Sequence, residues 1–160
     1  VAGLSMVCYG ALKIGLALPE EFSVVGALSA GCDRLGILPE TVRAVPDIAT
    51  LRANRARFSP ADYDRGMQFF LNFGSPAEFE QNDADNLFRL AEKAKAGGAA
   101  LPKLILRCGT EDTLALGPNR RFKAHLDALG IACDYAEFPG THSWAFWDEH
   151  IQYVLENLPV

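Results

Sequence analysis

The stretch Lys103-Leu104-Ile105-Leu106-Arg107-Cys108, ended by Gly109, carries the clearest fold signal in the sequence. A short apolar run bounded by a turn residue is typical of a strand that is buried on both faces. Strands of this kind occur in parallel sheets, because crossover helices cover both faces of such a sheet. The stretch therefore predicts a parallel sheet in an α/β protein.

Two further runs, at 23–29 and 133–138, have the same character, and helical patterns alternate with them. We expect helices at residues 6–18, 84–96, 118–129 and 143–158. This alternation of strand and helix predicts a parallel sheet with helices on its faces.

Two of the expected helices carry specific burial predictions. Residues 6–18 are almost all apolar or small, which predicts a helix that is buried all round. The last helix has one apolar stripe, formed by Trp144, Trp147, Ile151, Val154, Leu155 and Leu158.

The region 33–83 is broken into short pieces by four prolines, which are Pro39, Pro46, Pro60 and Pro76. One helix is expected at 60–73, after the capping signal of Ser59. With 160 residues, of which 49% are hydrophobic, the chain should form a single domain over 1–160. We expect 33–83 to be a cap-like insertion beside a functional site.

Composition excludes several classes of function. The net charge of −5 and the absence of Lys or Arg runs argue against a nucleic-acid partner. No stretch approaches the roughly 18 apolar residues of a membrane span. The four cysteines lack paired spacing, which argues against a metal site and favours free thiols in a reducing, cytoplasmic compartment. The oligomeric state stays open, a homo-oligomer included.

Polar residues with catalytic potential follow the strands or precede a helix. Ser5 comes just before the first helix, Glu111 and Asp112 follow the strand at 103–108, and His142 follows the strand at 133–138. Functional groups gather at the carboxyl ends of strands in an open parallel sheet. The order Ser, acid, His is the order that α/β-hydrolases use.

These residue types together suit nucleophilic catalysis. A serine hydroxyl needs an imidazole to take its proton, and a carboxylate holds that imidazole in the right tautomer. A tight turn before the helix would also aim the backbone N–H of Met6 at a developing oxyanion.

Each residue has a simpler interpretation. Ser5 could be only an N-cap, Asp112 a loop carboxylate or cap, and His142 a structural residue. Glu111 is a rival for the acid, although adjacent side chains in an extended loop point in opposite directions. His125 and His150 lie away from strand ends and are interpreted as surface or packing residues.

The sequence Gly3-Leu4-Ser5-Met6, followed by Tyr9-Gly10-Ala11, resembles the nucleophile elbow of the esterase D-like esterases, a group of α/β-hydrolases. That group includes tributyrin esterases, S-formylglutathione hydrolases, carbohydrate esterases and mycolyltransferases. Three later stretches resemble the same family: 101–103 with 108–112, then 119–122, then 139–144 with 146–148.

The resemblance implies Ser5 as nucleophile, Asp112 as acid, His142 as base and the Met6 amide as an oxyanion donor. Trp144 would be a wall of the substrate pocket, unless it serves only the apolar stripe. The implied activity is a serine carboxylesterase acting on small-molecule, short-chain acyl esters, with no cofactor. Alternatives are an S-formylglutathione hydrolase, a carbohydrate esterase, an acyltransferase, or a truncated fragment without catalysis.

Two departures from the family pattern carry expectations. Val7 and Cys8 replace paired glycines, and the Val7 side chain should crowd neighbouring strands at a cost of about 1–3 kcal/mol. The strands that precede the elbow in the family are absent apart from Val1-Ala2, so we expect the C-terminal part of an α/β-hydrolase fold.

Overall fold

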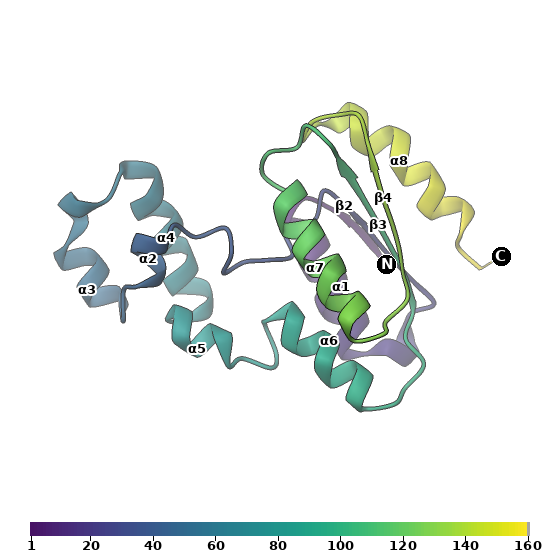
Figure 1. Ribbon diagram of the computed structural model, residues 1–160, viewed down its shortest axis with the longest axis horizontal. Coiled ribbons are helices and arrows are strands. Elements are labelled where there is room, and N and C mark those ends of the chain that lie inside the picture. Colours follow the sequence, from purple (N-terminus) through teal and green to yellow (C-terminus); the bar gives the residue numbers. More distant parts are fainter. Residues whose placement is uncertain (160) are drawn as a thin grey trace.

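The computed structural model describes residues 1–159 and contains a four-stranded parallel sheet in the order β1-β2-β3-β4 (Figure 1). The strands are β1 (Ala2–Leu4), β2 (Val24–Leu28), β3 (Lys103–Gly109) and β4 (Cys133–Phe138). The parallel α/β architecture and the three strands read from the sequence are confirmed. The strand before Ser5, of which the sequence predicted only Val1-Ala2 to remain, extends to Leu4. This strand, β1, pairs with β2 from Ala2 to Leu4.

Helices cover both faces of this sheet. On one face lie α1 (Met6–Ala17), α6 (Leu87–Ala96) and α7 (Leu116–Ala128), and on the other lies α8 (Trp144–Glu156) (Figure 1). Neighbouring residues of β2 point to opposite faces of the sheet. Val25 therefore packs toward α1, α6 and α7, and Val24 packs toward α8. A short 3₁₀ turn, Pro19–Glu21, lies between α1 and β2.

The prediction that the first helix is buried all round is wrong. One face of α1 is buried in the core through Cys8, Ala11, Leu12, Gly15 and Leu16. The opposite face is exposed, including Met6, Val7 and Ile14. Within residues 1–159 the helix is covered by the sheet and α6, and nothing covers its outer side.

The predicted stripe of the last helix is correct only in part. Trp147 and Val154 are buried against the sheet, but Trp144 is 75% exposed and Leu155 and Leu158 are also exposed. The buried face of α8 is completed by Phe146 and by His150, which stacks on Phe138. The buried face of α8 therefore contains Phe146 and His150 in place of the predicted Leu155 and Leu158.

The region 33–83 forms a group of short helices beside the sheet (Figure 1). They are α2 (Glu40–Arg43), α3 (Ile48–Ala53), a 3₁₀ turn (Arg55–Arg57), α4 (Pro60–Phe73) and α5 (Pro76–Glu80). The bounds of α4 are those predicted, and the Ser59 side chain accepts a hydrogen bond from the Asp62 amide. Two small apolar clusters, around Phe69 and around Leu51, hold these helices together.

The helix expected at 84–96 begins later, at Leu87. The side chain of Asn82 accepts hydrogen bonds from the amides of Ala84 and Asp85, which holds a turn there. Asn86 then caps the helix by accepting from the Phe88 amide. Within residues 1–159, every helix is too short or too polar to span a bilayer.

Candidate active site

Ser5 sits on a strained turn between β1 and α1. Its backbone has φ 51° and ψ −118°, in the positive-φ region that residues other than glycine rarely adopt. The turn is held because the Ser5 amide donates to Leu28 O and the Ser5 carbonyl accepts from Gly31 N. The Ser5 side chain makes no capping hydrogen bond to α1, so the N-cap interpretation does not describe this serine.

Asp112 lies in the loop after β3 and is 1% exposed. One carboxylate oxygen, Oδ1, accepts from the amides of Leu114 and Ala115 at 3.1 and 2.9 Å. The other oxygen, Oδ2, is therefore left to face His142. The neighbouring Glu111 is exposed to solvent, so the two carboxylates point apart as the sequence predicted.

His142 joins the two other residues. Its Nδ1 lies 2.7 Å from Asp112 Oδ2, and its Nε2 lies 2.7 Å from Ser5 Oγ. With the imidazole proton on Nδ1, the ring donates to Asp112 and accepts from the Ser5 hydroxyl. The three candidate residues thus form one continuous hydrogen-bonded chain, drawn from three separate strand ends.

Close backbone packing aligns the loops that carry Asp112 and His142. A Cβ on Gly109 would overlap with the carbonyl oxygen of Gly140, and Glu111 N donates to that same oxygen at 3.0 Å. The ring of Trp147 packs edge-on against His142, with centroids 4.9 Å apart. The His142 ring is thus held by packing against Trp147 and by hydrogen bonds at both ring nitrogens.

Val7 does not crowd the strands within residues 1–159, contrary to expectation, because it is 65% exposed. Cys8 is the residue that faces the sheet, and its single S–H lies between the carbonyl oxygens of Gly3 and Leu28, which are 2.9 and 3.1 Å from Sγ. Burial raises the pKa of Cys8 to about 12, so it remains a thiol rather than a nucleophilic thiolate. The cysteines are free, and Cys8, Cys32 and Cys108 are buried.

A cavity of about 470 Å³ opens beside Ser5 and His142. Met6, the first residue of α1, lines it, and so do Ile37, Leu114 and Pro118. Part of the region 33–83 borders this cavity, whereas its role as a cap stays a prediction. Trp144 does not line the cavity and packs instead on Trp147, with centroids 5.3 Å apart.

Sequence reasoning missed three residues of this site. Trp147 was assigned to the helix stripe alone, although its ring also supports His142. Ser29 and Arg34 both line the cavity. Their position at and just after the end of the strand expected at 23–29 was an available signal, because strand ends in parallel sheets converge on one edge.

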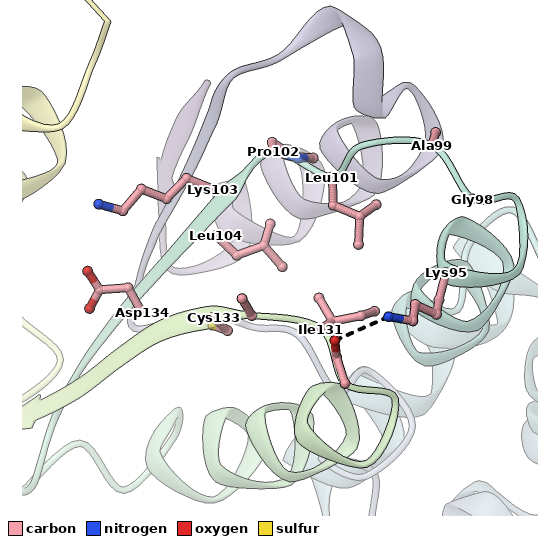
Figure 2. A pocket seen from close by; sticks show the side chains of 12 residues that line it. Lys95, Gly98, Ala99, Leu101, Pro102, Lys103, Leu104, Ile131, Cys133 and Asp134 are labelled. Carbon is pink, nitrogen blue, oxygen red and sulfur yellow. Dashed lines mark hydrogen bonds between the residues drawn. The ribbon is translucent and has the colours of Figure 1, made fainter.

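A larger cavity, of about 850 Å³, lies at the opposite edge of the sheet, where β3 and β4 begin (Figure 2). Leu101, Leu104 and Ile131 give it an apolar wall, and Lys95 Nζ donates to Gly130 O at 3.2 Å. Its one thiol, Cys133, has a pKa raised to about 12 by burial. The larger cavity therefore lacks an activated nucleophile, and the smaller one is the candidate site.

A family model described as "Putative esterase" matches residues 1–157. The chain belongs to this esterase family. An acetyl esterase from Caldicellulosiruptor saccharolyticus is 29% identical over 156 residues, which are 98% of this chain and 52% of that protein.

Two solved structures from Staphylococcus aureus share the fold of this esterase-family chain. The S-formylglutathione hydrolase FrmB matches with a TM-score of 0.69 and 22% identity, over 97% of this chain and 52% of that one. The fluorophosphonate-binding serine hydrolase FphF matches with a TM-score of 0.67 and 22% identity, over 97% and 51%. The chain thus spans about half the length of the relatives it matches.

No side-chain cluster within residues 1–159 of this esterase-family chain has three or more Cys, His, Asp or Glu residues placed to hold a metal ion. The polar groups around Ser5 form a continuous hydrogen-bonded chain. Asp112, His142 and Ser5 supply an anchored carboxylate, an imidazole and a hydroxyl in line.

Proposed function

We propose that this chain is the catalytic part of a serine carboxylesterase that hydrolyses short-chain acyl esters. Ser5 is the nucleophile, His142 the general base and Asp112 the acid that orients it. The observation that carries the proposal is the hydrogen-bonded chain from Asp112 through His142 to Ser5, with both links at 2.7 Å. Membership of the esterase family supports the same chemistry.

In the first half of the reaction, Ser5 Oγ attacks the ester carbonyl carbon while His142 Nε2 takes the hydroxyl proton. The carbonyl oxygen becomes an oxyanion, and the Met6 amide at the N-terminus of α1 donates to it. Collapse of this intermediate breaks the bond to the alcohol oxygen. The alcohol leaves with the proton from His142, and the acyl group stays on Ser5.

In the second half, His142 takes a proton from water, and the resulting attack on the acyl carbon releases the acid and restores Ser5. Asp112 accepts from Nδ1 throughout and stabilises the imidazolium that forms in each half. Transfer to an acceptor other than water, as in an acyltransferase, differs only in this step.

The size and lining of the cavity support small substrates. At about 470 Å³ it suits a small ligand rather than a polymer chain. Apolar side chains, including Met6 and Leu114, offer a surface for a short acyl chain.

The test is covalent labelling with a fluorophosphonate, which phosphonylates an activated serine. We expect the wild-type chain to gain one adduct, located on Ser5 by peptide mass spectrometry, and Ser5→Ala to gain none. Hydrolysis of 4-nitrophenyl esters from acetate to octanoate then measures the preferred acyl length, which we expect to be short.

Ser23→Ala is the matched control, because Ser23 is exposed and lies at the opposite end of β2. It should label at the wild-type rate. Equal labelling of wild type and Ser5→Ala would contradict the proposal. A chain that does not label at all would favour the alternative of a fragment without catalysis.

A further inference from the structure

The cavity beside Ser5 has an unusual charge. Three arginines line it, Arg34, Arg65 and Arg121, together with His142. No Asp or Glu is among its lining residues in the part of the chain that the structure describes. Since the whole chain has a net charge of −5, the positive groups are concentrated where a substrate would bind.

Two of these arginines already have carboxylate partners. Arg121 Nε donates to Asp33 Oδ2 at 2.6 Å, and Arg65 Nη1 lies 3.5 Å from Asp62 Oδ1. The second oxygen of Asp33 accepts from Gly36 N, so both oxygens of that carboxylate already accept hydrogen bonds. These two guanidinium groups are therefore partly neutralised.

Arg34 differs, because no ion pair or side-chain hydrogen bond connects it to any residue in 1–159. Asp33 and Glu80 line a neighbouring cavity that Arg34 also borders, and neither lies within 4.0 Å of its guanidinium. Its guanidinium lies over the Phe73 ring, 5.8 Å from the ring centroid, and makes a cation–π contact with it. Burial lowers the pKa of Arg34, as expected for a partly desolvated cation without a counter-ion.

The position of Arg34 relative to the nucleophile follows from Gly31. A Cβ on Gly31 would lie 3.8 Å from Arg34 Nη1 and 3.7 Å from the backbone oxygen of Ser5. The guanidinium and the Ser5 turn therefore flank the same glycine. A ligand group on Arg34 would be a few bonds away from a carbonyl carbon at Ser5.

A second and independent feature points to a polar ligand. Ser29 lines the same cavity, is fully buried, and its hydroxyl has no hydrogen-bond partner in the structure. A buried hydroxyl without a partner is destabilising, so a ligand that bonds to it is favoured. Its backbone also has a positive φ of 53°, a strained conformation that residues other than glycine rarely adopt.

From these observations we infer that Arg34 receives a carboxylate of the substrate, so that the pocket selects esters carrying a negative charge near the scissile bond. A guanidinium binds a carboxylate through two parallel hydrogen bonds, and the contact with the Phe73 ring leaves the N–H groups of Arg34 free to make them. The inference rests on the proposed esterase function of Ser5, and it adds the substrate class.

The carboxylate can belong to the acyl or to the alcohol part, and two pairs of esters separate these cases. The acyl pair is 4-nitrophenyl hemiglutarate against 4-nitrophenyl valerate. The alcohol pair is 4-acetoxybenzoate against 4-methylphenyl acetate. For each pair, kcat/KM for the charged ester is divided by that for the neutral ester, after subtraction of the spontaneous rate.

Arg34→Met should lower this ratio about 10- to 100-fold in one pair, the usual effect of losing a hydrogen bond to a charged group. Comparing variants cancels the different intrinsic reactivities of the esters. Arg52→Met is the matched control, because Arg52 is exposed on α3 and borders none of the cavities described. It removes the same charge and should leave the ratio unchanged.

Binding of glutarate to the Ser5→Ala chain, measured by calorimetry, provides a readout that needs no catalysis. We expect glutarate to bind, and added Arg34→Met to abolish the binding. Glutarate binding by a chain that fluorophosphonate does not label would refute the esterase proposal and support the anion site. Equal ratios in wild type and Arg34→Met, or glutarate binding that survives Arg34→Met, would overturn the inference.

Discussion

At the residue scale, two adjacent carboxylates have opposite environments. Asp112 is buried and accepts three hydrogen bonds, from two backbone amides and from His142. Glu111 faces solvent. Since the amides hold Oδ1, the contact of Oδ2 with His142 has a fixed direction, which is the property that an orienting acid requires.

Replacing Asp112 by Asn should lower esterase kcat about 10⁴-fold while leaving the fold intact. Oδ1 can keep its backbone bonds, but the new amide N–H would face His142 Nδ1. The imidazole proton would then move to Nε2, which could no longer accept from Ser5. Steady-state hydrolysis of a 4-nitrophenyl ester measures the loss. Glu111→Gln is the control. A comparable loss of kcat in that variant would show that the assignment of the acid to Asp112 is wrong.

At the scale of elements, the crossing of α1 over β2 depends on one glycine. A Cβ on Gly15 would collide with the Cγ2 methyl of Val25, a buried side chain of β2. Gly10, five residues earlier on the same helix, has no atom within 4 Å of the corresponding position. The same helix therefore contains a glycine required by packing and one that is not.

Gly15→Ala should lower the free energy of unfolding by about 1–3 kcal/mol, because the added methyl overpacks a buried contact. Gly10→Ala should raise it, by at most about 1 kcal/mol, because alanine favours the helix. Urea denaturation followed by circular dichroism measures both. A stability loss in Gly10→Ala as large as in Gly15→Ala would show that helix packing does not distinguish the two sites.

At the scale of the whole molecule, acid stability should depend on a link between β4 and α7. Hydrogen bonds from Arg120 and Tyr135 lower the pKa of Glu137 from 4.5 to about 2. A carboxylate with a lowered folded-state pKa stabilises the fold above its unfolded pKa. This contribution is lost as the pH falls from about 4.5 toward 2.

Glu137→Gln should therefore be less stable than wild type at pH 6, and the difference should shrink at pH 2.5. Urea unfolding at the two pH values measures it. Glu156→Gln, at the exposed end of α8, should show no such change with pH. A gap between wild type and Glu137→Gln that is the same at both pH values would contradict the linkage.

Much of the architecture is local in origin and could be predicted. The apolar run of β3 and the Ser59 cap of α4 depend on neighbouring residues, and both appear where the sequence places them. Burial of the helix faces was predicted less well. Val7 and Trp144 are as apolar as their buried neighbours, so only the partner that covers each face decides which of them is exposed.

The sequence by itself determined the parallel α/β class and the order of Ser5, Asp112 and His142 along the chain, because periodicity and turn residues are written locally. Tertiary structure alone decided that these three meet at 2.7 Å, since their strands are far apart in sequence. It alone also left Arg34 without a carboxylate partner among residues 1–159. Which charges are paired depends on distances in space, and no local pattern encodes those.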